Sequence, residues 1–151
     1  MMKEEIIGRI DLINEERINM KLIEEIREIG KLYHVQGCDE SQIKKAEKDL
    51  NMEFPNEYKE YLKEYGAISF FGTEWTGLNV EEYIDVVRVT VKERELNKNF
   101  PLKYFVLENL GIDGLLTIVS ENGKVFSWNP NGKINLIAKN LIDYLEICKK
   151  R

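Results

Sequence analysis

The stretch from Asp39 to Gly66 constrains the fold most, because it contains two consecutive helix signatures separated by a break. Asp39 is a favourable N-cap, and Gln42 three residues later completes a capping box. The break lies at Phe54-Pro55, since proline disfavours helix at the residue before it and suits the first turn of a new helix. We therefore predict two short helices, the second ending at Gly66 with a left-handed cap.

Each of these helices carries one apolar face. The spacing between its apolar residues is three or four, which is the period of a helix and excludes a strand. The residues are Ile43, Ala46 and Leu50 in the first helix, and Tyr58, Tyr61, Leu62 and Tyr65 in the second.

Residues 3–32 have a similar period and charged residues on the other face, which predicts one long amphipathic helix or two in series. The apolar positions are Ile6, Ile7, Ile10, Ile13, Ile18, Leu22, Ile26 and Ile29. A coiled coil is an alternative, but strict heptads are not kept, so we favour a helix packed on its own domain. We divide the chain into an N-terminal helical extension, 1–36, and a core, 37–151, of one domain.

After Gly66 the pattern changes to short runs rich in β-branched and aromatic residues, separated by turn residues. The predicted strands are 67–71, 75–78, 104–108, 115–120, 124–128 and 133–137. Asn122-Gly123 between two of these runs is typical of a primed hairpin turn. Residues 80–96, with Asn79 as N-cap, and residues 141–148 are predicted helices. The fold class is α+β, with a mainly antiparallel sheet of about five or six strands flanked by helices.

The length of 151 residues fits a single domain with a proper core. A net charge of −5 argues against a nucleic-acid binder and favours a basic protein partner. Cys38 and Cys148 form no disulfide framework, and the beginning of the chain lacks the charge pattern of a signal peptide. No apolar run reaches membrane-spanning length, so we expect a cytoplasmic protein.

Residues with catalytic potential are few. His34 is the single histidine, and its spacing to Cys38 would suit a nucleophile and base only if an orienting group were present. Gly72 and Gly77 have the spacing of a phosphate loop but lack the lysine that follows it. Adjacent glutamates on helices favour a solvated face, and Asp113 is typical of a turn. We therefore expect no enzyme, cofactor or metal site.

Trp75 and Trp128 lie at or beside predicted turns, where a tryptophan can serve as an interface anchor or as core. We favour the core for both, because burial is the usual outcome for so large a ring. Glu74 beside Trp75 is the place where an acidic group and an aromatic anchor share a turn that we expect to be exposed.

From Cys38 onward the chain resembles the SUKH superfamily, which includes the yeast Smi/Knr cell-wall regulators and many bacterial immunity proteins. The matching residues of the helix pair are Ile43, Glu47, Leu50, Phe54-Pro55, Tyr58, Leu62 and Gly66. Further on they are Thr90, Arg94, 104–107, Gly114, Leu116, Thr117, Val125, Trp128, Ile137, Ala138 and the helix through Leu145. Ala67-Ile68 departs from the glycine-rich continuation of the family, and the N-terminal helix lies outside its pattern.

The resemblance implies a non-enzymatic immunity protein that binds and neutralises a cognate toxin domain, such as the basic nuclease domain of a secreted LXG-type toxin. The alternative is a regulatory protein-interaction module like the eukaryotic relatives. We place the toxin-binding surface at Glu74, Trp75, Glu108 and Asp113, and expect no direct nucleic-acid or membrane contact.

Overall fold

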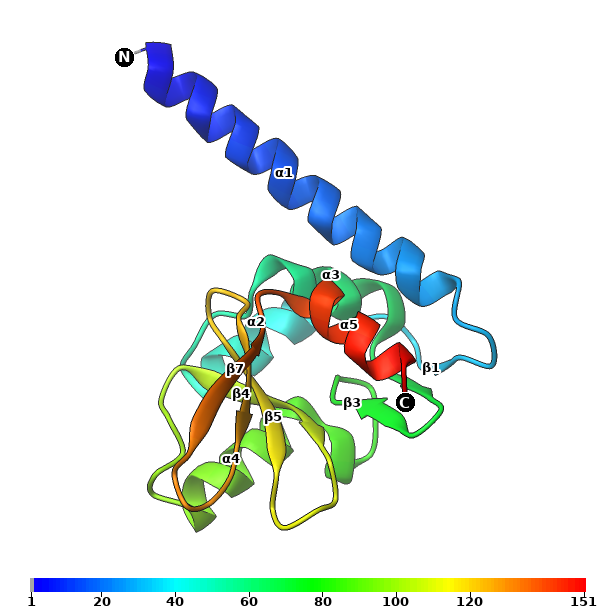
Figure 1. Ribbon diagram of the computed structural model, residues 1–151, viewed down its shortest axis with the longest axis vertical. Coiled ribbons are helices and arrows are strands. Elements are labelled where there is room, and N and C mark those ends of the chain that lie inside the picture. Colours follow the sequence, from blue (N-terminus) through cyan, green and yellow to red (C-terminus); the bar gives the residue numbers. More distant parts are fainter. Residues whose placement is uncertain (1) are drawn as a thin grey trace.

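The computed structural model describes the backbone of residues 2–151 and the side chains of residues 8, 9 and 12–151. Helices pack on both faces of a sheet, and one long helix projects from the domain (Figure 1). The helices are α1 (Met2–Arg27), α2 (Glu40–Leu50), α3 (Asn56–Tyr65), the 3-10 helix η1 (Glu82–Ile84), α4 (Val86–Leu96) and α5 (Leu141–Lys149). None of the described helices is both long and apolar enough to span a bilayer.

The described strands form two antiparallel sheets, which confirms the α+β class. One sheet has the order β1 (Tyr33–His34), β2 (Ile68–Phe70), β3 (Thr73–Trp75), and the other β4 (Tyr104–Asn109), β5 (Leu116–Ser120), β6 (Val125–Trp128), β7 (Ile134–Ala138). The N–H of Thr76 donates to the carbonyl of Leu107 at 2.8 Å and joins the two sheets. The sequence prediction missed β1, because two exposed residues carry no apolar pattern.

The four-stranded sheet separates two groups of buried side chains, because alternate residues of a strand face opposite ways. On one face Phe105 lies against Tyr58 of α3, with 4.4 Å between ring centroids. On the other face Trp128 meets Phe100 at 5.2 Å, beneath α4. Trp75 stacks on Tyr144 of α5. Both tryptophans are buried, which confirms that they belong to the core.

The helix pair α2–α3 forms as predicted. The Gln42 N–H donates to the Asp39 carboxylate at 2.8 Å, and the Gln42 side chain accepts from the Asp39 N–H at 3.1 Å. Pro55 is the N-cap of α3 and not its first helical residue, a small correction. Gly66 caps α3 as predicted in position but not in conformation, because φ of +71° with ψ of −57° is not the left-handed helical region. A side chain there would meet the carbonyl of Gln36 at 2.3 Å.

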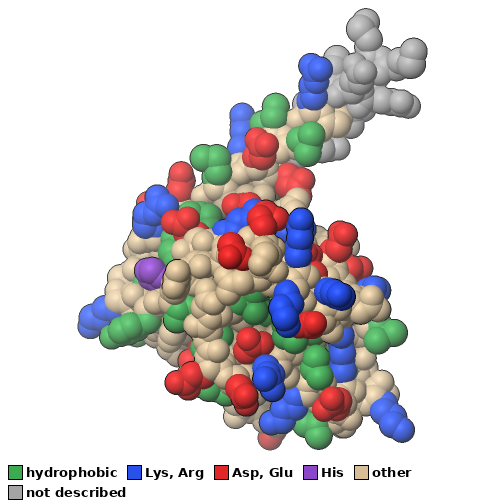
Figure 2. Space-filling model, turned by 180° about the vertical axis from the view of Figure 1, so that it is seen from behind, with side chains coloured by type: hydrophobic (Ala, Val, Ile, Leu, Met, Phe, Trp, Pro, Cys, Tyr) green, Lys and Arg blue, Asp and Glu red, His purple; other side chains and the backbone are tan. Residues whose placement is uncertain are grey.

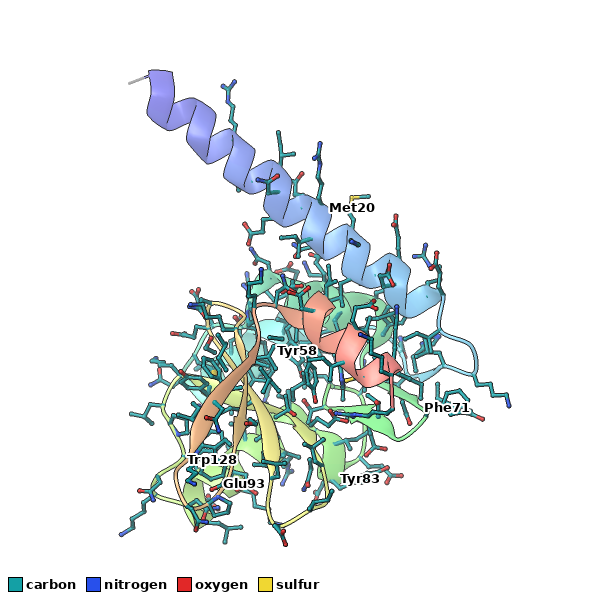
Figure 3. All side chains as sticks on the ribbon, in the orientation of Figure 1. Met20, Tyr58, Phe71, Tyr83, Glu93 and Trp128 are labelled. Atoms are coloured by element: carbon teal, nitrogen blue, oxygen red, sulfur yellow. The ribbon has the colours of Figure 1, made fainter. Side chains whose placement is uncertain are left out.

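Among the described side chains of helix α1, those that contact the domain lie in its second half. Leu22 and Ile26 are fully buried, and the Tyr65 hydroxyl donates to the carbonyl of Ile23 at 2.9 Å. Further toward the N-terminus, Leu12 and Ile13 are exposed, and the helix extends away from the domain (Figures 1 and 3). Among the described side chains, the predicted packing on its own domain therefore holds for the second half of the helix. The side chains of Ile6, Ile7 and Ile10 lie outside the described set.

The turns of the β6 hairpins share one geometry. The Gly123 N–H donates to the carbonyl of Ser120, and the Gly132 N–H to that of Asn129, each at 2.9 Å. The hairpin at Asn122-Gly123 is confirmed, but its predicted primed turn is wrong. A type I′ turn requires positive φ at both residues, whereas only Gly123 has it, at +86°. This geometry is a type I turn followed by a left-handed glycine.

Two predicted boundaries between Gly66 and α4 are wrong. The turn between β2 and β3 lies at Phe71 and Gly72, so β3 begins at Thr73 and not at Trp75. Residues 80–96 do not form one helix capped by Asn79. Asn79 has a left-handed backbone, with φ of +61°, and its side chain instead bonds the carbonyl of Gln36.

Candidate protein-binding surface

A groove of about 970 Å³ lies between helices η1 and α4 on one side and the ends of β3 and β4 on the other. Half-buried Ile84, Val87 and Val91 give it an apolar lining. Tyr83 is 65 % exposed beside them and lies on the outside of the domain, whereas Tyr58 lies within it (Figure 3). Apolar surface with an exposed tyrosine is typical of protein-binding sites.

The shape of this groove follows from how the chain enters α4. Asp85 is the N-cap of α4, and its carboxylate accepts the N–H groups of Val87 and Arg88, each at 3.0 Å. Gly77 holds η1 in place, because it donates to Ile84 and accepts from Val86. A side chain at Gly77 would meet the carbonyl of Gly66 at 1.8 Å. These contacts end η1 at Ile84 and place the N-cap of α4 at Asp85. Tyr83 therefore precedes α4 and remains exposed.

Acidic residues outnumber basic ones around the groove. Its lining includes Glu74, Glu82, Glu93 and Glu95 against Arg88 and Lys92. Arg88 pairs with Glu82 at 3.7 Å, but both side chains are more than half exposed, so the pair contributes little to stability. Seen from behind, the surface of the molecule has charges of both signs interspersed (Figure 2).

The predicted site residues fall into two groups. Glu74 is exposed and lines the groove, and Asp113 is exposed in the turn after β4. Trp75 and Glu108 are buried, with Glu108 only 2 % exposed. Trp75 and Glu108 therefore lie beneath this surface and cannot touch a partner unless the core opens. The expectation of an exposed aromatic anchor beside Glu74 is wrong, because Trp75 is buried.

Glu108 is the centre of a buried hydrogen-bond network. Arg151 donates to its carboxylate at 2.6 Å and also to Thr73 and Tyr144, each at 3.1 Å. The hydroxyl of Tyr144 donates to the other oxygen of Glu108 and lies 2.8 Å from that of Thr117. Burial and the charge of Glu108 raise the pKa of Tyr144, so its hydroxyl stays protonated. The network ties α5 and the end of the chain to both sheets.

Several groove residues were missed from the sequence, above all Tyr83 and Glu82. Assigning residues 80–96 to one helix placed Tyr83 on its apolar face together with Ile84 and Val87. The available signal was Asp85, which is as favourable an N-cap as Asn79. The network partners Tyr144 and Arg151 had no local signal, because they meet Glu108 only in the folded chain.

The surroundings of Cys38 and His34 do not favour a catalytic pair. Burial raises the pKa of the Cys38 thiol to about 11, which opposes formation of the nucleophilic thiolate. The Nδ1 atom of His34 lies 3.0 Å from the carbonyl of its neighbour Val35. Among the described residues no group of His, Cys, Asp and Glu suits a metal ion.

Glu57 is a buried carboxylate next to the start of α5. It accepts the N–H of Leu141 at 3.1 Å through one oxygen, while the other has no partner among the described residues. Burial raises the pKa of Glu57 to about 7, although the backbone N–H groups of α5 act in the opposite direction. The carboxylate therefore connects α3 with α5 and costs free energy when it is ionised.

We expect Glu57 to make the free energy of unfolding fall as the pH rises from about 4.5 to 7. The folded chain holds this proton more tightly than the unfolded chain, where the pKa is near 4.5. The loss approaches about 3 kcal/mol. Glu57→Gln keeps an oxygen for Leu141 and removes the titration, so urea denaturation at pH 5 and 8 should show a smaller decline than in the wild type. If the free energies of unfolding of the wild type and of Glu57→Gln fell equally between pH 5 and 8, Glu57 would not be the titrating group.

The fold and the groove define an α+β protein with a surface suited to binding another protein. The family model SUKH_5, described as SMI1-KNR4 cell-wall, matches residues 19–148. The chain belongs to this family, as the resemblance implied. The comparison with curated proteins gives no match.

The residues that carry the family resemblance hold the scaffold together. Glu47 accepts the N–H of Phe54 at 2.8 Å, across the break between α2 and α3. Arg94 donates to the carbonyl of Leu50 at 2.8 Å and so satisfies the end of α2. Thr90 accepts the buried N–H of Val106 at 3.0 Å and joins α4 to β4. These three residues thus hold the fold together.

Thr90→Val should lower the free energy of unfolding by about 1–3 kcal/mol. Valine has the same shape but leaves the buried N–H of Val106 without an acceptor. Chemical denaturation measures the change, and Lys92→Ala on the exposed side of α4 is the control, with an expected effect within about 0.5 kcal/mol. An equally small effect of Thr90→Val would show that the hydrogen bond contributes nothing.

Proposed function

We propose that the protein is an immunity protein that binds a cognate toxin domain and neutralises it. The observation that carries the proposal is the groove beside α4, with its apolar lining and acidic rim, on a chain of the SUKH family. The family is generally one of non-enzymatic immunity and interaction domains. The buried Cys38 thiol agrees with binding and not with chemistry.

We propose Glu74 and Asp113 as contacts on this surface, with Tyr83 as the aromatic anchor. Glu74 lines the groove, and Asp113 follows Gly111, which also lines it. Glu108 supports Glu74 from below, because the Glu74 N–H donates to the Glu108 carboxylate at 3.4 Å. An acidic surface of this kind attracts a basic domain and speeds the encounter.

The proposed partner is a basic nuclease domain of a secreted, LXG-type toxin. A nuclease must approach phosphates, and so it carries the positive charge that the groove complements. Binding takes place in the cytoplasm of the producing cell, where the chain protects its own nucleic acid. The protein touches neither nucleic acid nor membrane in this role.

Co-expression in bacteria tests the proposal. The toxin domain encoded by the neighbouring gene is induced once with this chain and once with an empty vector. We expect growth with the wild-type chain and arrest with the vector, together with a complex on gel filtration. Arrest in both cases without a complex would refute the immunity role and favour a regulatory interaction module.

A further inference from the structure

Strand β7 is the open edge of the four-stranded sheet. The order of that sheet is β4-β5-β6-β7, and among the described residues no strand pairs with the outer side of β7. The β4 edge, by contrast, is bonded to the segment after β3. An open edge presents free backbone N–H and C=O groups, which an added strand can pair with.

This edge also exposes apolar side chains. Ile134, Leu136 and Ile137 are 41, 56 and 37 % exposed. In the ladder Ile134 is opposite Trp128 and Leu136 opposite Phe126, so two of them continue apolar rows that begin inside the sheet. An added strand would cover these rows.

Charge decides between a second copy and a different partner. Lys133 and Lys139 are exposed at the two ends of β7, about 20 Å apart at the rise of a strand. When two copies of β7 pair antiparallel about Leu136, each Lys133 lies opposite Lys139 of the other copy. Like charges directly opposite destabilise such a pair. A segment with acidic residues at both ends meets the same lysines favourably.

We propose that β7 binds an extended segment of a partner protein, which adds a strand to the sheet and carries an acidic residue at each end. This surface is distinct from the groove and does not depend on the immunity role. Its charge preference is opposite to that of the groove, so the two surfaces select different segments.

A fluorescent peptide tests the proposal on the full chain. The probe alternates valine and threonine between two glutamates spaced as Lys133 and Lys139 are; a matched probe has lysines at the ends. Anisotropy at low salt should show about tenfold tighter binding of the glutamate probe. The double variant Lys133→Glu with Lys139→Glu should reverse the preference.

Leu136→Asp separates apolar contact from charge. It should weaken both probes, because it places a charge on the covered row, and Leu136 is exposed enough for the variant to fold. Equal binding of the two probes, an unchanged preference in the double variant, or no effect of Leu136→Asp would overturn the proposal. A wild-type dimer that Leu136→Asp dissociates in sedimentation would also overturn it, because β7 would then bind a second copy.

Discussion

Arg151→Ala should lower the free energy of unfolding by about 2–4 kcal/mol. The substitution removes the cation from Glu108, whose side chain is only 2 % exposed, and an unpaired buried carboxylate is costly. It also removes hydrogen bonds to Thr73 and Tyr144. The side chain of Arg151 is 28 % exposed. Water that enters the space it leaves can therefore solvate Glu108 and offset part of the loss. Urea denaturation at neutral pH measures the change.

Two further variants test whether the unpaired charge of Glu108 causes this loss of stability. Lys150→Ala alters the exposed neighbour and should change stability by less than about 0.5 kcal/mol. Adding Glu108→Gln to Arg151→Ala should recover part of the stability, because a neutral amide is less costly to bury than an unpaired charge. A double variant less stable than Arg151→Ala would mean that the charge of Glu108 is not the source of the loss.

The second large effect concerns binding. A triple variant should lower the affinity for the toxin domain by about 100-fold, because attractive charges on the proposed surface become repulsive or neutral. Its substitutions are Glu74→Lys, Glu82→Lys and Asp113→Asn. Asparagine is chosen at position 113 because Asp113 has φ of +48°, which asparagine tolerates. All three side chains are exposed, so the fold should persist. Calorimetric titration gives the affinity.

A matched variant controls for net charge. Glu16→Lys and Glu24→Lys on α1, with Glu28→Gln just after it, change the charge by the same amount. Helix α1 lies on the opposite side of the domain from α4 (Figure 1). The matched variant should weaken binding by less than about fivefold through slower encounter alone. If both variants lose affinity equally, net charge and not the groove determines binding.

Local sequence signals predicted the fold where they were unambiguous. Asp39 with Gln42 located α2, and Gly66 located the end of α3, because caps depend on neighbouring residues. The start of α4 was misplaced because two caps compete, Asn79 and Asp85, and tertiary contacts of Gly77 decide between them. The split into two sheets depends on long-range pairing, which a local pattern does not contain.

The candidate site was less predictable than the fold. Glu74 and Asp113 were placed on the surface from turn residues alone, and both are exposed. Glu108 lies at the end of a predicted strand, and we expected it to be equally accessible. In the structure Arg151 and Tyr144, which lie near the end of the chain, contact its carboxylate and enclose it. Tyr83 itself gave no signal, because its exposure follows from the break before Asp85, and Asp85 as a second possible N-cap was the one indication of that break.

Hydrogen exchange of this chain with and without the purified toxin domain tests the central claim most directly. We predict a complex in which protection rises in residues 73–76, 82–95 and 109–113, the segments that form and adjoin the groove. Protection confined to other segments, or no complex at micromolar concentrations, would contradict the claim that the groove neutralises a toxin.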